Sequence, residues 1–333
     1  MPVVSRRRVE VRRSAILHRR LALRAVPASR PGPTLPRDRF FANDRYRATR
    51  EWKRYEGTAQ RELFRILRER FLARHAPATK WALDVGSGPG RFTGRLGAPD
   101  TPRRVAFDLG GEMLEELRTR WPRGPGALPE PELVRGDAVR PPFAIGQVGL
   151  VAGLGNLIGF AGDEAPAILE SLTSMLTPGG TLLLEVAPGP GEYSRYLRRL
   201  PAGSAARLLR SPLSAVAARV AREGFREAPA RKQLPGAFRR VDPAKLRGRL
   251  VERGFAVEEV VAVAPALGPD GARIQVVRED PKAWGHLLEL EEALGRSPEH
   301  WPAAAAVLVA AVAPGGGGPA GEGEEGRVPQ SEG

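Results

Sequence analysis

Residues Leu83–Thr93 read LDVGSGPGRFT, and this stretch indicates both a fold and a kind of ligand. An apolar run that begins at Trp81 leads directly into Gly86-x-Gly88-x-Gly90. The run predicts a buried strand, and the glycines predict a sharp turn whose bare backbone lets a ligand lie close. We therefore expect a nucleotide-type site at the end of this strand.

The spacing of the glycines excludes two common nucleotide motifs. A dinucleotide fingerprint needs its third glycine at the position that Arg91 occupies. The G-x-x-x-x-G-K-[ST] phosphate loop is also absent, because neither Lys nor the required Ser/Thr follows. Instead an acid, Asp84, stands two residues before the first glycine. A carboxylate there would repel a pyrophosphate and suits a cationic amine.

Acidic residues also end the next two predicted strands. Val105–Asp108 is a short apolar run that ends in an acid, and a carboxylate at such a strand tip can accept both ribose hydroxyls. The segment after it, Leu109–Leu117, predicts the start of a helix. Glu132–Ala138 then predicts a third strand that ends in Gly-Asp-Ala around Asp137.

Two further apolar runs complete a repeating pattern. Val148–Leu154 predicts a fourth strand, and Gly155–Phe160 after it predicts a loop that faces the same cleft. Leu176–Gly180 predicts a turn into a fifth strand, Thr181–Val186. The intervening segments have helical patterns, notably Glu112–Arg120 and Glu164–Met175. Strands that alternate with helices predict a parallel sheet, with the site at the carboxyl ends where the chain order switches.

In this order the motifs resemble those of the class I S-adenosylmethionine (SAM)-dependent methyltransferases. The resemblance covers roughly residues 40–313 and includes the family's D-x-S-x-x-M-L pattern, with Gly110 in place of the small hydroxyl residue. It implies an α/β fold: a Rossmann-like seven-stranded, mostly parallel sheet with helices on both faces. It also implies N-terminal helices that cover the cofactor and an insert after the fifth strand.

The resemblance implies SAM as the cofactor, with Asp84 toward the amine, Asp108 toward the ribose and Asp137 toward the adenine edge. Methyl transfer would be an in-line displacement in a desolvated cleft, for which alignment suffices and no dedicated nucleophile is required. The expected cofactor-binding residues are Asp84, Gly86, Ser87, Gly88, Gly90, Asp108, Leu109, Asp137, Ala138, Gly155 and Asn156.

No catalytic residue is assigned from the sequence. Glu185, Glu192, Tyr193 and His286 are possible general bases, and each is interpreted as structural or solvated. We expect a small-molecule acceptor. The alternatives are an RNA or protein methyltransferase that uses the basic N-terminal arm, or a non-catalytic SAM-binding protein.

Composition narrows the functional class. The chain has no cysteine and four scattered histidines, so disulfides and thiolate ligands are excluded and no metal site is predicted. The apolar run Ala303–Val312 is too short to span a bilayer. We expect a soluble, cytoplasmic protein without membrane contact.

The two ends of the chain differ from its body. Residues 1–36 hold nine Arg and one Glu and predict a flexible basic arm. A targeting segment and a start codon assigned too far upstream are the other two interpretations of this arm. Residues 314–333 predict a disordered tail. The formal net charge is +14, and nucleic acid is a partner that the arm would suit.

Between the ends we expect residues 37–80 to form an N-terminal helical segment and residues 81–313 to form the methyltransferase domain. Tyr46 and Tyr55 in the first segment are candidates for cofactor or substrate contact. Residues 188–240 are interpreted as a substrate-side insert. After it we predict a helix at Asp242–Arg253 capped by Asp242, a strand at Phe255–Val263, a short strand at Ile274–Val277, a helix at Pro281–Leu294 and a final strand at Ala305–Val312.

Overall fold

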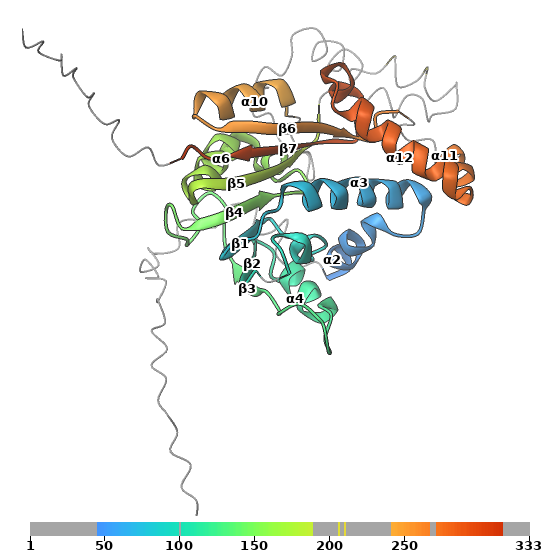
Figure 1. Cartoon of the computed structure of the whole chain (residues 1–333). Helices are drawn as coiled ribbons and strands as arrows, with labels where there is room; N and C mark the ends of the chain where they lie inside the picture. Colours follow the sequence, from blue (N-terminus) through green and yellow to red (C-terminus); the bar gives the residue numbers. More distant parts are fainter. Residues whose placement is uncertain are drawn as a thin grey trace, which may run out of the picture.

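A computed structural model describes residues 45–99, 101–188, 206, 210, 241–266 and 271–315. Its strands form one sheet in the order β3-β2-β1-β4-β5-β7-β6, with β7 antiparallel to both of its neighbours (Figure 1). This confirms the predicted Rossmann-like sheet. The strands are β1 (Trp81–Val85), β2 (Arg103–Asp108), β3 (Glu132–Arg135), β4 (Val148–Gly153), β5 (Leu176–Val186), β6 (Ala256–Val263) and β7 (Ala306–Val312).

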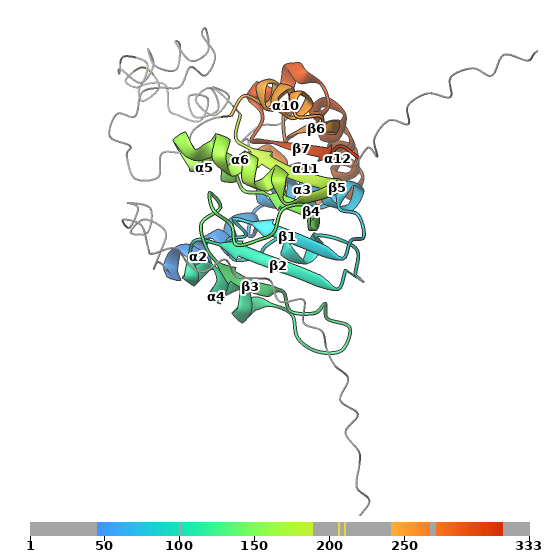
Figure 2. The same ribbon diagram turned by 90° about the vertical axis from the view of Figure 1, so that its left-hand side faces the viewer.

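Helices cover both faces of the sheet (Figures 1 and 2). One face carries α3 (Ala59–His75), α4 (Gly111–Arg120), α11 (Gly271–Glu279) and α12 (Pro281–Gly295). The other carries α5 (Leu157–Ala161), α6 (Ala165–Ser174) and α10 (Pro243–Glu252). Outside the first layer, α2 (Arg45–Trp52) packs on α4 and continues into the 3₁₀ turn η1 (Lys53–Tyr55). Further 3₁₀ turns are η2 (Thr93–Arg95), η3 (Gly162–Glu164) and η4 (Pro298–Ala303).

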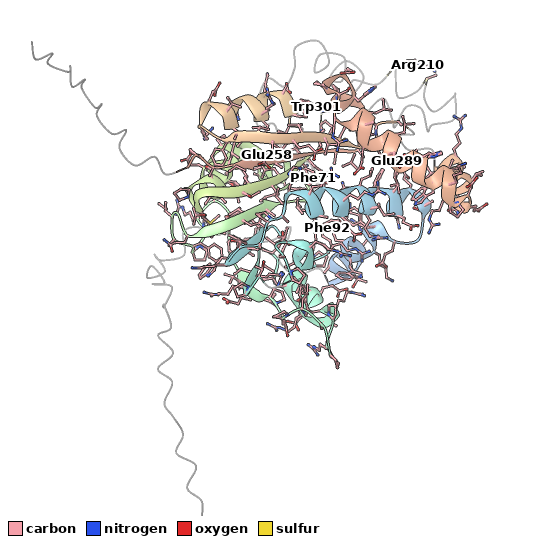
Figure 3. All side chains as sticks on the ribbon, in the orientation of Figure 1. Phe71, Phe92, Arg210, Glu258, Glu289 and Trp301 are labelled. Carbon is pink, nitrogen blue, oxygen red and sulfur yellow. The ribbon has the colours of Figure 1, made fainter. Side chains whose placement is uncertain are left out.

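The two cores follow the alternation of side chains along each strand. In β1, Ala82 belongs to the core beneath α3, whereas Leu83 and Val85 belong to the core beneath α6 and α10. Phe71 of α3 is fully buried in the first core (Figure 3). Strands buried on both faces need continuous apolar runs, which is why the runs are visible in the sequence.

Capping fixes the start of α10. The carboxylate of Asp242 accepts hydrogen bonds from the amides of Ala244 (2.9 Å) and Lys245 (3.3 Å), and Pro243 occupies the first helical position. The sequence prediction for this cap is therefore confirmed. Asp280 caps α12 in the same way, through the amides of Lys282 and Ala283.

The predicted strand at Ile274–Val277 is wrong, because these residues belong to α11. Ile274 is fully buried against α3 and α12, whereas Val276 is 69% exposed. A strand would place these two residues on the same face, and only a helical turn separates them this way. The β-branched composition was a local preference that packing between helices overrode.

Several sequence predictions lie outside the described residues. They are the basic arm (residues 1–36), most of the insert (188–240) and most of the tail (314–333). The described residues fix where the insert joins the sheet, since the amide of Val241 donates to the carbonyl of Ala187 at 3.0 Å. The chain thus departs and returns at one point beside the carboxyl end of β5. Within the described ranges, no helix is both long and apolar enough to cross a membrane.

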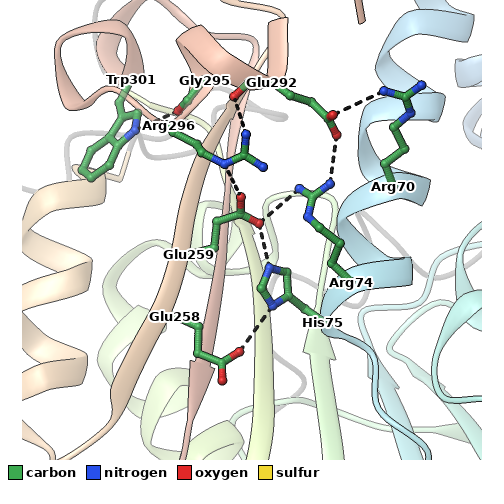
Figure 4. Close-up of polar contacts among 9 residues, drawn as sticks. All are labelled: Arg70, Arg74, His75, Glu258, Glu259, Glu292, Gly295, Arg296 and Trp301. Carbon is green, nitrogen blue, oxygen red and sulfur yellow. Dashed lines mark hydrogen bonds and ion pairs between the residues drawn. The ribbon is translucent and has the colours of Figure 1, made fainter. Parts of the chain in front are cut away.

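An ion network ties α3 to β6 and α12 on the face away from α10 (Figure 4). The carboxylate of Glu259 accepts from His75 (2.7 Å), Arg74 (3.1 Å) and Arg296 (2.9 Å). Arg74 also donates to Glu292 at 2.9 Å. Burial would raise the pKa of Glu259, but the hydrogen bond from His75 and the nearby arginines outweigh burial and lower it to about 2.

We expect Glu259→Gln to lower the free energy of unfolding by about 1–2 kcal/mol at neutral pH, after allowance for solvent screening. Because the folded-state pKa lies below the unfolded value of 4.5, this contribution is present above about pH 4.5 and is lost as the pH falls toward 2. Urea unfolding at several pH values measures it. Glu170→Gln, at an exposed pair with Arg253, is the control. A constant difference between wild type and Glu259→Gln down to low pH would contradict the prediction.

Candidate cofactor-binding cleft

A cleft opens at the carboxyl ends of the parallel strands, where the order switches between β1 and β4. It contains all the expected cofactor-binding residues except Gly90 and Asn156. Its lining consists of Arg47, Glu51, Arg54, Tyr55, Asp84, Gly86, Ser87, Gly88, Pro89, Arg91, Phe92, Phe107, Asp108, Leu109, Met113, Gly136, Asp137, Ala138, Leu154, Gly155, Leu157, Phe160, Ala161 and Ile168.

The glycine loop folds back onto the end of β2. The amides of Gly86 and Ser87 both donate to the carbonyl of Phe107, at 2.7 and 3.2 Å. Gly86 has a φ of +69°, and a Cβ at this position would lie 2.9 Å from Leu157. Gly88 has a φ of +55°, and a Cβ there would have nothing within 4 Å. Gly88 thus leaves open space beside bare backbone in the cleft.

No α-helix follows the glycine loop, and the chain there makes only the short turn η2. A helix N-terminus would have offered its amides and dipole to a phosphate. Arg91, which replaces the third glycine of the dinucleotide fingerprint, instead pairs with Glu56 at 2.7 Å. The loop therefore lacks the structural basis of a pyrophosphate site, in agreement with the acid at position 84.

Asp108 joins the loop to β2. Its Oδ2 accepts from the amide of Gly88 at 2.8 Å, and its Oδ1 accepts from the amide of Gly110 at 2.7 Å. Burial raises the pKa of this carboxyl, although these two amides and the charge of Arg47 act in the opposite direction. Each oxygen retains a further lone pair, so the carboxylate can still accept hydrogen bonds from a ligand.

Asp84 lies deeper in the same cleft and is only 3% exposed. Its Oδ2 accepts from the hydroxyl of Thr93 at 2.6 Å. Burial raises the pKa of Asp84 to about 7, the Thr93 hydrogen bond lowers it in part, and the charge of Asp108 adds to the rise. A cationic ligand would strongly stabilise the ionised form of a carboxyl that is buried in this way.

Asp137 forms the third acidic position. Its Oδ1 accepts from the amide of Val139 at 2.9 Å, so the side chain also shapes its own turn. A Cβ at the preceding Gly136 would lie 2.6 Å from the ring of Phe107, and glycine is therefore required where the strand passes that ring. Asp84, Asp108 and Asp137 thus stand at the ends of three adjacent strands, β1, β2 and β3.

The outer wall of the cleft comes from the N-terminal helices that the resemblance implied, although of its residues the sequence indicated only Tyr55. Arg47, Glu51, Arg54 and Tyr55 come from α2 and η1, which lie over the glycine loop. Of the two tyrosines singled out, Tyr55 lines the cleft, and the side chain of Tyr46 lies outside the described part. The spacing of apolar residues predicted helices here but did not indicate where they lie relative to the site.

An apolar wall from α5 and α6 was also missed. Residues 157–160, part of the predicted loop Gly155–Phe160, instead belong to the short helix α5. Phe160 and Ile168 present apolar surface to the cleft, together with Leu154. The helix brings these side chains together in space.

Two of the expected residues have structural roles. Gly90 has a φ of +79°, and a Cβ there would collide with Leu117 of α4. Asn156 is 7% exposed, has a φ of +68°, and accepts a hydrogen bond from the amide of Ala187 through Oδ1 at 2.8 Å. Its side chain therefore holds the loop after β4 to the chain that leaves β5. Asn156 Nδ2 has no hydrogen-bond partner within the described residues.

Of the four possible general bases, the two that the structure describes do not line the cleft. Glu185 is buried in an ion pair with Arg68. His286 is exposed on α12. Glu192 and Tyr193 lie outside the described residues. Among the described residues, no group of His, Cys, Asp and Glu side chains is arranged to bind a metal ion.

Residues 82–180 match the family described as "Methyltransferase domain". No curated protein matches the chain. Similar solved structures include a magnesium protoporphyrin IX methyltransferase of Synechocystis PCC 6803 (14% identity, 80% of this chain, 94% of that chain, TM-score 0.45). A second is a SAM-dependent methyltransferase of Mesorhizobium loti (16% identity, 78% of this chain, 99% of that chain, TM-score 0.42). A third is a geranyl diphosphate C-methyltransferase of Streptomyces coelicolor A3(2) (13% identity, 74% of this chain, 76% of that chain, TM-score 0.42).

Residues 82–180 thus form a methyltransferase domain. This match supports methyltransferase activity with SAM as the cofactor. The described residues fit that cofactor: Gly88 and Gly155 leave open space at the cleft, and a buried carboxyl is available for a cation.

We expect Asp84→Asn to change stability and SAM binding in opposite directions. The raised folded-state pKa makes the carboxyl's contribution to stability full below about pH 4 and lost as the pH rises through 7. The variant should therefore gain stability relative to wild type over that range, by on the order of 2–4 kcal/mol at pH 8. At pH 8 its SAM affinity should fall, because the variant removes the charge that we expect to face the amine.

Thermal unfolding from pH 4 to pH 8 and calorimetric SAM titration measure the two effects. Asp280→Asn is the matched control, since it makes the same substitution at a helix cap outside the cleft, where Asn caps about as well as Asp. If Asp84→Asn is less stable than wild type at pH 8, the carboxyl is not an uncompensated buried charge, and the raised pKa of Asp84 is wrong.

Proposed function

We propose that the protein transfers the methyl group of SAM to a small-molecule acceptor inside this cleft. The observation that carries the proposal is the row of carboxyl groups of Asp137, Asp108 and Asp84 across β3, β2 and β1. SAM presents an adenine, a ribose and a cationic amine in the same linear order. When bound, SAM supplies an electrophilic methyl group on a positively charged sulfur.

In this proposal each carboxyl has a separate task. Asp137 or its neighbouring amide meets the adenine edge, and Asp108 accepts the ribose hydroxyls with the lone pairs that Gly88 and Gly110 leave free. Asp84 faces the amine. The methyl-donor end then lies over β1 and β4, near Tyr55 and Gly155.

The chemistry proposed for the chain is alignment and exclusion of water. Tyr55 is 8% exposed, and Phe92 and Leu154, at 7% each, enclose the same end. Holding two reactants in line in such a site can supply about 7–11 kcal/mol of the barrier in favourable cases. The outer wall formed by α2 and η1 favours an acceptor small enough to enter beside it.

The binding mode is tested first. We expect Asp108→Ala to weaken SAM by about 1–3 kcal/mol, because hydrogen bonds to a charged acceptor are lost. Calorimetry with SAM and with the demethylated product S-adenosylhomocysteine (SAH) measures this, and Asp163→Ala, outside the lining, is the control. Equal affinities of wild type and Asp108→Ala would remove the ribose assignment.

The acceptor class is tested with SAM that carries a labelled methyl group. Cell extract is divided into low-mass, RNA and protein fractions, and each is incubated with the enzyme. We expect the label in the low-mass fraction, unaffected by ribonuclease or protease. Label in RNA or protein would reverse the ranking of acceptors, and binding of SAM without transfer to any fraction would favour the non-catalytic alternative.

One observation favours the second candidate, an anionic macromolecule such as RNA. Residues 45–188 and 241–315 contain 28 Lys or Arg and 28 Asp or Glu, so this part of the chain is neutral. Residues 189–240 contain eleven Arg, one Lys and three Glu. The positive charge of the body is therefore confined to the insert, which joins the sheet at Ala187 and Val241. Mobility-shift assays with tRNA at two salt concentrations would detect the salt-dependent binding that this candidate requires.

A further inference from the structure

A buried ion pair stands directly behind the cleft. Arg68 of α3 binds Glu185 of β5 through two hydrogen bonds, Nη2 to Oε1 at 2.6 Å and Nε to Oε2 at 3.0 Å. The two side chains are 5% and 6% exposed, and neither belongs to the lining. Removing two charges from water costs several kcal/mol each, so the attraction and hydrogen bonds must offset a large penalty. Stability alone is a weak explanation for such a pair.

Each member of the pair contacts a residue of the cleft wall. Glu185 Oε2 also accepts from the amide of Gly155 at 3.2 Å, and Gly155 lines the cleft. The guanidinium of Arg68 lies 5.1 Å from the ring centroid of Tyr55, which lines the cleft from the other side. The ring of Tyr55 in turn packs edge-on against Phe92 at 5.3 Å. The pair thus supports both walls of one end of the cleft.

The strand order identifies that end. Glu185 is the penultimate residue of β5, Gly155 follows β4, and Asp84 is on β1, so the pair lies next to the end assigned to the methyl donor. The sulfonium of SAM carries a positive charge that SAH lacks. A lone guanidinium one residue layer away would repel that charge through a medium that screens poorly. A guanidinium cannot relieve this by losing its proton.

We propose that Glu185 is a selectivity residue, whose carboxylate cancels the charge of Arg68 and so allows the cleft to hold the cationic SAM as well as the neutral-sulfur SAH. Arg68 acts as the positioning residue that supports the ring of Tyr55. The proposal rests on the orientation of SAM given under the proposed function. In agreement with it, Arg68 keeps the pKa of Glu185 below its usual value, and burial raises the pKa of Tyr55 so that its hydroxyl adds no charge.

The test compares the ratio of the dissociation constants of SAM and SAH in the full-length protein. Glu185→Gln keeps the size of the side chain and leaves Arg68 charged. We expect this variant to raise the ratio Kd(SAM)/Kd(SAH) about tenfold. Coulomb's law gives an effect of this size between a guanidinium and a sulfonium that one layer of residues separates, at an intermediate dielectric. A purely structural role would weaken both ligands alike and leave the ratio unchanged, which would overturn the proposal.

A second variant covers the case in which the lone guanidinium prevents folding. Arg68→Met with Glu185→Leu removes both charges, and such apolar replacements of buried pairs are often neutral or stabilising. We expect this double variant to fold and to keep the wild-type ratio to within about twofold, because the wall remains neutral. A tenfold change in its ratio would show that cancellation of charge is not the function of Glu185.

The matched control is Glu69→Gln on α3. It changes the net charge by the same amount, but Glu69 pairs with Arg65 and Arg95 at a partly exposed position. We expect no change in the ratio, because solvent screens this site. Failure of the proposed function itself would look different, since wild-type protein would then bind neither SAM nor SAH.

Discussion

The hydrogen bond from the amide of Gly88 to the carboxylate of Asp108 is the contact on which the site depends. It joins the loop after β1 to the tip of β2 at 2.8 Å. The parallel register pairs Asp84 with Ala106, so the two strands end close together and the loop can reach its neighbour. With the loop held there, the carboxyl of Asp84 stays beneath it and the open side of Gly88 stays toward the cleft. The geometry of this part of the cleft is thus set by the register of two buried strands.

The fold and the part of the cleft formed by strand ends and their turns could be predicted from sequence, because they follow local rules. Buried parallel strands require apolar runs, and the turns after them require glycine and acids at fixed offsets, as at Gly86 and Asp108. Only the family resemblance implied an outer wall of N-terminal helices, since nothing local to Arg47 or Tyr55 specifies that α2 and η1 lie over the glycine loop. Ile274 shows the same limit, because its β-branched neighbours masked a helix that is defined by packing on α3.

Buried charges in this protein are compensated to different degrees. The guanidinium of Arg104 donates to the carbonyls of Leu96 and Thr101 at 3.0 Å each and so fixes the chain between η2 and β2. Arg68 and Glu185 compensate one another. Asp84 is held by the hydroxyl of Thr93 and keeps a raised pKa. Incomplete compensation at Asp84 costs stability in the free protein, and in the proposed binding mode the cationic amine of SAM offsets that cost.

The outer wall is attached to the glycine loop. The ring of Trp52 contacts two guanidinium groups, with its centroid 5.0 Å from that of Arg91 and 5.2 Å from that of Arg120. Arg91 follows the glycine loop directly and also pairs with Glu56, while Gly57, with a φ of +83°, separates this wall from α3. The cation–π contacts and the ion pair therefore link the wall to the loop and to α4. Because Arg91 belongs to both sets of contacts, the position of the wall and that of the loop depend on one another.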